Sequence, residues 1–367
     1  MAKNNNLKTA KKNKNDEFYT LMEDIEKELR FYTKSFEGKV VYCNCDDYQQ
    51  SNFYKYFYYN FHYLKLKKLI CTGYKADNNG LYAIYDGVTE VTGKLKGNGD
   101  FRSEECIEYL KQADVVVTNP PFSLFRQYVK QLMDYDKKFI IIGNQNAITY
   151  KEIFQLIKDN KIWLGTISNK TMEFNIPMSY EKWSRIEDNK KYAKLGSISW
   201  FTNVPYVYER KPLILTKSYY DNTSAYPKYD NYDAINVDKT CDIPMDYDGV
   251  MGVPITFLDK YCPTQFEIIG LMSGAKDSSL INGNDGRAKF YINGKGVYAR
   301  ILIKKKDDLT PIPAQFEILG LAADKRDENP LWIKGKETYL DEKHKKFVGM
   351  VLNGKATYAR IIIKKVS

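Results

Sequence analysis

The sequence predicts an α/β fold, a doubly wound and mostly parallel sheet followed by a β-rich C-terminal region. Short, continuous apolar runs such as Val115–Val117 and Phe139–Ile142 alternate with segments of helical periodicity. Runs of this kind are typical of strands buried on both faces of a parallel sheet. After residue 178 the helical periodicity gives way to alternating segments rich in Tyr, Asp and Asn. These segments indicate β-structure.

The first part of the chain alternates between expected helices and strands. Leu21, Ile25, Leu29 and Tyr32 have helical spacing, and Ser51 and Ser103 stand where helix caps are expected. Six glycines between residues 73 and 99, among alternating Tyr and Val, predict a hairpin. The expected helices are 21–32, 51–64, 103–112, 123–133 and 148–159, and the expected strands are 40–43, 69–71, 114–117, 139–143 and 162–164.

The last hundred residues contain an internal repeat. Gln265–Leu271 returns as Gln315–Leu321, and the basic segment Tyr298–Lys305 returns as Tyr358–Lys365. An Asn-Gly pair precedes each basic segment, which favours a hairpin. Two units are too few for a solenoid, so the repeat predicts a duplicated small module.

Composition and charge exclude several classes of protein. The chain has 367 residues, 43% of them hydrophobic, and no apolar run close to the roughly 20 residues that a membrane helix needs. Two histidines and six cysteines without a Cys-x-x-Cys pair argue against a metal site and against a histidine-based triad. We therefore expect a soluble, cytoplasmic protein with reduced cysteines and no metal. The net charge of +10, concentrated toward both ends, suits a polyanion partner, although a lysine-rich surface explains it equally well.

One tetrapeptide, Asn119-Pro120-Pro121-Phe122, indicates the chemistry of the protein. It follows the strand that ends at Val117, and ligands bind at the carboxyl ends of such strands. Two prolines remove two backbone donors, so nearby carbonyls and the Asn119 side chain form an acceptor-rich slot beside the flat Phe122 ring. Accepting both hydrogens of a planar amine frees the nitrogen lone pair for attack without a histidine base. The alternative is a rigid strand-to-helix turn.

The tetrapeptide resembles the [Asn/Asp/Ser]-Pro-Pro-[Tyr/Phe/Trp] motif of amino-group methyltransferases that use S-adenosylmethionine. Over roughly residues 15–305 the chain more closely resembles the EcoRI-type adenine-specific DNA methyltransferases. The resemblance implies a Rossmann-like methyltransferase fold and N6 methylation of a flipped-out adenine at a specific site in double-stranded DNA. It also implies a protective enzyme of a restriction–modification system, with any cognate endonuclease encoded separately. The supporting segments are Asn15–Thr20, Cys43–Asp47, Ser51–Phe53, Asn119–Phe122, Gly143–Asn146 and Ser199–Asn203.

The resemblance also assigns residues to the cofactor. A segment like Phe18-Tyr19-Thr20 helps to hold the methionine carboxylate, and Asp100-Phe101 grips the adenine. The chain departs from the family at Tyr48, where proline is usual, and it lacks the usual glycine-rich loop. The alternative interpretation of Asp46, Asp47 and Asp100 is that they are ordinary turn residues without a contact to the cofactor. The remaining expected cofactor contacts are Cys45, Asp46, Asp47, Ser51, Asn52 and Phe53.

Expected DNA contacts lie farther along the chain. Trp200 and Phe201 stand where related enzymes place an aromatic ring against the flipped base. Core aromatics of a strand are an equally good interpretation. The lysines at the ends of the basic repeats would meet phosphates, unless they only protect edge strands from aggregation. These lysines are Lys304, Lys305 and Lys306, with Lys364 and Lys365 in the second copy.

The order of the motifs predicts the domain organisation. Only 73 residues separate Asp46 from Asn119, so a recognition region is expected after about residue 170. We expect a disordered basic arm at 1–15, a catalytic core at 16–177, its continuation with β-rich insertions at 178–260, and module copies at 261–306 and 307–367. Methylation of RNA or of a protein glutamine through the same slot, and a DNA-binding protein without catalysis, remain alternatives.

Overall fold

The computed structural model describes residues 18–205, 211–272, 281–285, 287, 289–306, 316–322, 351–352, 355–356 and 360–365. The expected basic arm at 1–15 lies outside these residues. The chain divides into two compact units, residues 1–305 and 306–367, and each is described by itself.

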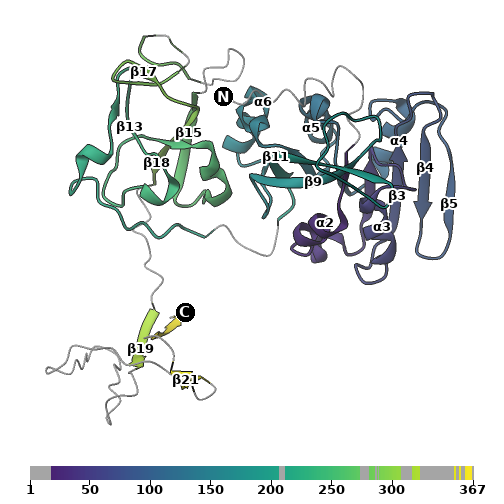
Figure 1. Cartoon of the computed structure of the whole chain (residues 1–367), viewed down its shortest axis with the longest axis horizontal. Helices are drawn as coiled ribbons and strands as arrows, with labels where there is room; N and C mark the ends of the chain where they lie inside the picture. Colours follow the sequence, from purple (N-terminus) through teal and green to yellow (C-terminus); the bar gives the residue numbers. More distant parts are fainter. Residues whose placement is uncertain are drawn as a thin grey trace. The chain divides into compact units, whose positions relative to one another are not determined.

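Four parallel strands form the centre of the large sheet in the first unit (Figure 1). The first two of these strands, β2 and β3, pair in parallel, and β6 lies on the other side of β2. β7 follows β6, again in parallel. All four coincide with predicted strands, to within one or two residues at each end. They are β2 (Val40–Asn44), β3 (Lys68–Gly73), β6 (Val115–Thr118) and β7 (Lys138–Asn144).

Antiparallel strands extend the sheet on both sides, so the sheet is mixed and the expectation of a mostly parallel sheet was wrong. The predicted hairpin, β4 (Leu81–Tyr85) and β5 (Glu90–Lys94), pairs with β3. The predicted strand at 162–164 also runs antiparallel, against β11. Periodicity reports burial but not strand direction, which explains the error. The other flanking strands are β1 (Tyr19–Thr20), β8 (Trp163–Leu164), β9 (Lys170–Ile176), β10 (Arg185–Glu187) and β11 (Lys190–Thr202).

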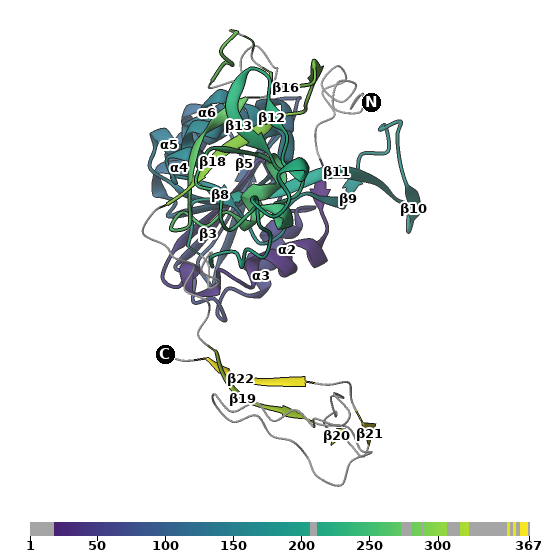
Figure 2. The same cartoon turned by 90° about the vertical axis from the view of Figure 1, so that its left-hand side faces the viewer.

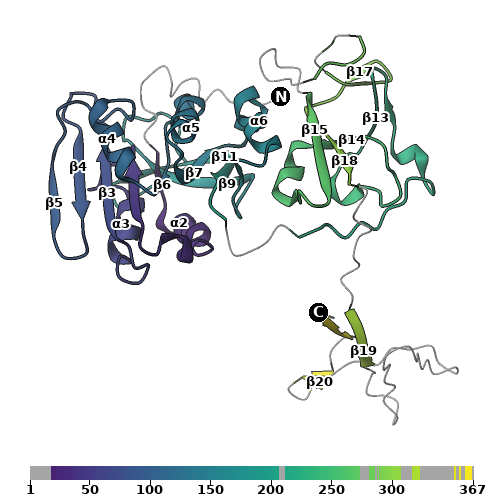
Figure 3. The ribbon, with the colours of Figure 1, turned by 180° about the vertical axis from the view of Figure 1, so that it is seen from behind.

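Helices cover the two faces of this sheet. Figure 3 shows α4, α5 and α6 on one face and α2 and α3 on the other. The strand residues alternate accordingly, since Val40 and Tyr42 face one hydrophobic cluster while Val41 and Cys43 face the other. The helices are α2 (Met22–Leu29), α3 (Asn52–Tyr59), α4 (Glu104–Gln112), α5 (Phe125–Asp134) and α6 (Lys151–Lys158).

Both predicted helix caps are confirmed. The Ser51 side chain accepts hydrogen bonds from the backbone N–H groups of Phe53 and Tyr54, and Ser103 accepts one from Cys106. Short 3-10 helices complete the connections, and one of them follows the Asn-Pro-Pro turn. They span Thr33–Phe36, Phe122–Leu124, Gln145–Thr149, Thr223–Ala225, Thr240–Asp242 and Ile255–Lys260. Among the described helices the longest has ten residues, about half of what crossing a membrane requires.

A second sheet of five strands follows in the first unit (Figure 2). Lys158 of α6 donates to the carbonyl of Ile269, 2.8 Å away, so this sheet contacts the helical layer. The β-rich structure expected after residue 178 is therefore present. Its strands, in spatial order, are β12 (Lys228–Tyr229), β13 (Tyr232–Asn236), β14 (Met251–Pro254), β18 (Arg300–Lys305) and β15 (Phe266–Met272), with a hairpin of β16 (Tyr291–Ile292) and β17 (Lys295–Gly296).

The described residues of the second unit form two pairs of strands. Its main pair has Phe316 opposite Lys365, as β15 and β18 have Phe266 opposite Lys305, and both pairs shift register at the same point. The pairing pattern of the repeat is thus the same in both units. The strands are β19 (Phe316–Ala322), β20 (Val351–Leu352), β21 (Lys355–Ala356) and β22 (Arg360–Lys365).

A buried carboxylate, Glu28, joins α2 to the segment that follows β8. One of its oxygens accepts hydrogen bonds from Thr166 N and from the Tyr32 hydroxyl, both at 2.8 Å. The other accepts from the Thr166 hydroxyl at 2.6 Å and from Ile167 N at 2.8 Å. A Cβ at Gly165 would lie 2.3 Å from Glu28, so only glycine fits there.

Replacing Glu28 with alanine is expected to lower the free energy of unfolding by about 3 kcal/mol, because two part-buried N–H groups and two hydroxyls lose their acceptor. Urea denaturation of the purified protein measures this loss. Glu26, on the exposed side of the same helix, provides the control, and its alanine variant should stay within about 0.5 kcal/mol of wild type. Equal stability of the two variants would contradict the role of Glu28.

Candidate active site

A cavity of about 260 Å³ opens at the carboxyl ends of the parallel strands β2 and β6. This is where the sequence predicted a ligand site. Nine predicted residues line it, namely Phe18, Tyr19, Cys45, Asp46, Asp47, Asp100, Phe101, Asn119 and Pro121. Five lining residues were not predicted, namely Tyr74, Gly99, Arg102, Ser123 and Leu124.

A buried polar network holds the strand ends together beneath the cavity. The Thr118 hydroxyl contacts the carbonyl of Asn44 and lies 2.7 Å from Oδ2 of Asp46. The Thr72 hydroxyl donates to Oδ1 of Asn44 at 3.1 Å. Cys45 adopts a left-handed conformation with φ of 63°, which turns the chain sharply after β2. Side chains from three adjacent strands thus fix the start of the loop that follows β2.

The Asn119 side chain presents an acceptor to the site. Its Nδ2 donates to the carbonyl of Phe18 at 2.7 Å, which orients the amide. Its Oδ1 is buried and has no hydrogen-bond partner among the described residues. The Phe122 ring stacks near Phe18, with centroids 6.1 Å apart and planes 28° apart. The turn therefore presents an unpartnered acceptor, and Phe122 supplies a flat ring that packs on Phe18.

Asp47 is held by a cation that the sequence did not indicate. Its Oδ2 lies 2.7 Å from Nζ of Lys75, and its Oδ1 accepts the backbone N–H of Gln49 at 3.0 Å. The Asp47 side chain is 3% exposed, so this carboxylate is a fixed part of the wall and not a solvated turn.

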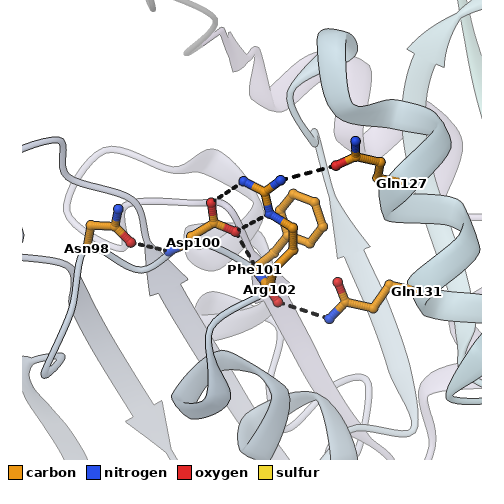
Figure 4. Close-up of polar contacts among 6 residues, drawn as sticks. All are labelled: Asn98, Asp100, Phe101, Arg102, Gln127 and Gln131. Carbon is orange, nitrogen blue, oxygen red and sulfur yellow. Dashed lines mark hydrogen bonds and ion pairs between the residues drawn. The ribbon is translucent and has the colours of Figure 1, made fainter.

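Arg102 fixes the Asp100 carboxylate at the opposite wall (Figure 4). Arg102 donates from Nε to Oδ1 at 2.8 Å and from NH2 to Oδ2 at 2.6 Å. Its side-chain hydrogen bonds lower the pKa of Asp100. Oδ1 also accepts the backbone N–H of Arg102 at 2.9 Å, so a free acceptor position remains on Oδ2.

Two glutamines of α5 connect this wall to the helix behind the Asn-Pro-Pro turn (Figure 4). Gln127 accepts a hydrogen bond from Arg102 at 3.1 Å, and Gln131 donates to the carbonyl of Phe101 at 2.9 Å. The Phe101 ring packs edge-on against Tyr128, with centroids 5.0 Å apart. Gly99, with φ of +78°, lets the loop approach β3, because a Cβ there would lie 2.3 Å from the carbonyl of Gly73.

Several expected site residues support the cavity without lining it. Ser51 caps α3, and Asn52 donates to the carbonyl of Thr20 at 2.7 Å. The Thr20 hydroxyl is buried without a hydrogen-bond partner in the described structure. Phe53 is a core residue, 1% exposed. Pro120 and Phe122 also lie outside the lining, although Phe122 contacts Phe18.

The two aromatics expected against the target base are core residues. Trp200 and Phe201 have no exposed surface, and both pair with β7 in the middle of the sheet. Trp200 packs edge-on against Phe53, at a centroid distance of 5.9 Å. Neither residue lines the cavity. This placement favours the alternative interpretation, in which they are core aromatics of a strand.

The lysines expected at phosphates differ in their surroundings. Lys305 donates to the carbonyl of Met245 at 2.6 Å and lies 3.0 Å from Asp248, so its charge is partly engaged. Lys304 stands opposite Glu267 in the strand register, and Lys306 is exposed. The side chains of Lys364 and Lys365 lie outside the described structure.

Asp46 is the strongly perturbed carboxyl of the cavity. Burial raises its pKa from 3.8 to about 7, against the opposing effect of hydrogen bonds from Thr118 and Ser51. Between these two pH values the folded protein therefore keeps the Asp46 carboxyl protonated, whereas the unfolded chain ionises it. The stability contributed by protonated Asp46 is present at low pH and is lost as the pH rises toward 7.

Replacing Asp46 with asparagine is expected to remove this pH dependence. Wild type should lose on the order of 4 kcal/mol relative to the variant as the pH rises from 4 to 7, because the unfolded carboxyl ionises earlier than the folded one. Urea denaturation of both proteins across this range measures the difference. A constant difference would show that the Asp46 pKa is not raised.

Comparisons with known proteins agree with this geometry. The family model for adenine-specific methyltransferase EcoRI matches residues 6–306. Type II methyltransferase M.EcoRI of Escherichia coli is 49% identical over 330 residues, which cover 83% of this chain and 98% of the relative. Type II methyltransferase M.MgeORF184P of Mycoplasma genitalium is 42% identical, covering 81% of this chain and 98% of the relative.

Type II methyltransferase M.MpnI of Mycoplasma pneumoniae is 39% identical, with 82% of this chain and 98% of the relative covered. No solved structure matches the chain. The family match covers the whole cavity and ends where the second unit begins. The chain belongs to the EcoRI family of adenine-specific methyltransferases.

Proposed function

We propose that this enzyme methylates N6 of adenine at a specific site in double-stranded DNA, with S-adenosylmethionine as the methyl donor. The unpartnered Oδ1 of Asn119 carries this assignment, because it is a buried acceptor beside an apolar wall. The family is adenine-specific, and its named relatives are type II methyltransferases. We also propose a role as the protective enzyme of a restriction–modification pair with a separate endonuclease, and the names of the type II relatives support this role.

The Asn119 amide would bind the exocyclic amine of the target base. Its Nδ2 is already committed to Phe18, so Oδ1 faces the incoming N–H group. The carbonyl of Pro120 carries no neighbouring donor, because Pro121 has no N–H, and it would accept the second hydrogen. Phe122 would pack on the base. These contacts favour a pyramidal nitrogen whose lone pair is available.

The residues of the cavity fit the cofactor. Oδ2 of Asp100 has a free acceptor position for the adenine amino group, and the buried Thr20 hydroxyl lacks a partner where the methionine end would be held. Asp46 and Asp47 line the same cavity. When bound, S-adenosylmethionine supplies an electrophilic methyl group on a cationic sulfur.

The arrangement of the chain supports separate regions for catalysis and for reading the DNA sequence. We infer a doubly wound catalytic core at 16–177 with its continuation at 178–260, because helices cover both faces of the parallel strands. We also infer a module at 261–306 that is duplicated at 307–367, since the strand registers agree. The region after residue 170 would read the DNA sequence, with Lys304 and Lys306 near phosphates.

Replacing Asn119 with alanine is expected to reduce methyl transfer at least about 100-fold, because the acceptor for the target amine is lost. Modified-base sequencing of DNA from a host that expresses each protein gives the product and its sequence context. Cofactor affinity, measured by calorimetry, should change little. Asn60, whose amide also donates to a backbone carbonyl, is the control, and its alanine variant should retain activity.

N6-methyladenine within one short motif, absent with the Asn119 variant, would support the proposal. A new mark that persists with the Asn119 variant would contradict the slot mechanism. Purified wild type that methylates RNA or protein in place of DNA would contradict the substrate assignment.

Replacing Asp100 with alanine is expected to weaken S-adenosylmethionine binding about tenfold or more, through loss of an acceptor to the adenine amino group. Calorimetric titration measures this change. Asp86 also caps a turn through its carboxylate, but it lies at the hairpin of β4 and β5, away from the cavity. Its alanine variant should bind the cofactor normally, and equal affinities for all three proteins would reject the role of Asp100.

A further inference from the structure

The segment that follows β9 and continues into β10 exposes large apolar side chains. Trp183 is 53% exposed, Met178 is 61% exposed and Ile186 is 50% exposed. Figure 2 shows that β10 and the beginning of β11 project away from the rest of the sheet. Neither the family match nor the chemistry of the slot assigns a role to these side chains.

The segment that bears Trp183 is connected to the cavity through Phe18 and through the strand register. The Tyr180 ring packs edge-on against Phe18, with centroids 5.5 Å apart, and the Phe18 carbonyl holds the Asn119 amide. Trp183 follows Tyr180 by three residues, so their Cα atoms are at most about 10 Å apart. In the strand register Arg185 lies opposite Tyr192, Tyr192 opposite Asn175, and Asn175 opposite Tyr19, which lines the cavity. Trp183, two residues before Arg185, therefore lies beside the strand ladder that leads to the cavity.

Hydrogen bonds and an ion pair hold this segment in place. Ser184 N donates to the carbonyl of Tyr192 at 2.7 Å, and the Lys191 side chain donates to the carbonyls of Met178 and Tyr180. Arg185 pairs with Glu173 at 3.0 Å. An exposed tryptophan on a fixed segment has little conformational freedom left to lose on binding. This low entropic cost favours a role as a contact surface.

The charge of the projecting hairpin suits a polyanion. Residues 178–194 contain five basic and three acidic residues, and Arg185 contacts one of these acids, Glu187. Lys190 and Lys194 are exposed and have no ion-pair partner among the described residues. Apolar side chains flanked by lysines are what a protein uses to enter a stack of bases while contacting phosphates.

We propose that Trp183 inserts into the duplex at the target step and occupies the space that the extruded adenine leaves. This inference rests on the proposed DNA methylation. Extrusion of a base costs a few kcal/mol in lost stacking and pairing. An indole in the vacated space restores stacking with the neighbouring bases. Trp183 would stabilise the duplex from which the adenine is extruded and would not contact the reacting atoms. It is therefore a positioning residue.

The test compares single-turnover methylation of two duplexes that contain the recognition motif. One duplex is fully matched, and the other has an abasic site opposite the target adenine, which removes the pairing that extrusion must break. For Trp183→Ala we expect methylation of the matched duplex to slow about tenfold or more, and the abasic duplex to restore most of the rate. With 2-aminopurine at the target position, the fluorescence increase on binding should shrink in parallel.

Two further variants complete the design. Trp183→Phe keeps a flat apolar ring and should retain most of the wild-type rate. Tyr63→Ala removes an aromatic residue that is 77% exposed but does not line the cavity, and it should behave as wild type. Cofactor affinity should be unchanged in all three variants, which shows that each is folded.

The outcomes separate this inference from the proposed function. Wild type that methylates neither duplex would overturn DNA methylation itself. If wild type is active and Trp183→Ala matches it, the insertion role is overturned. An equal loss of rate on the matched and the abasic duplex would also overturn it, because that pattern reports a defect unrelated to extrusion.

Discussion

The hydrogen bonds of the Thr118 hydroxyl underlie the whole site. This one side chain, at the end of β6, contacts the Asn44 carbonyl at the end of β2 and the Asp46 carboxyl in the loop that follows. It immediately precedes Asn119. The loop that follows β2 and the Asn-Pro-Pro turn are therefore held by the same residue. Because Asp46 is buried and shares this contact, its protonation is coupled to the geometry of both.

The sequence predicted well what local chemistry determines. The caps at Ser51 and Ser103, the central parallel strands and the hairpin at 73–99 follow from short-range rules and are confirmed. The direction of the strand at 162–164 was wrong, because the apolar run Ile162–Leu164 is compatible with either direction. Strand direction depends on the path of the chain between elements, which periodicity does not contain.

The site residues likewise divide into those that motifs indicated and those that only the fold reveals. Asn119, Asp46 and Asp100 were found from motifs, whereas Arg102 and Lys75 were not. An arginine two residues after an aspartate has no signature of its own, and its role appears only when the fork reaches both the carboxylate and α5. Aromatic residues were similarly ambiguous: a motif pointed to Trp200, which is buried, and nothing pointed to Trp183, which is exposed. Burial distinguishes them, and it is a property of the fold.

The Phe18 carbonyl shows how distant segments come to act as one site. Phe18 precedes the short β1, an edge strand that pairs with β9, and more than a hundred residues separate it from Asn119. By accepting one of the two Nδ2 hydrogens, it orients the amide, whose Oδ1 has no hydrogen-bond partner among the described residues. The Phe18 ring contacts Phe122 on one side and Tyr180, near the exposed Trp183, on the other. Phe18 therefore connects the segment that bears Trp183 with the Asn119 amide, for which we propose the role of acceptor for the target amine.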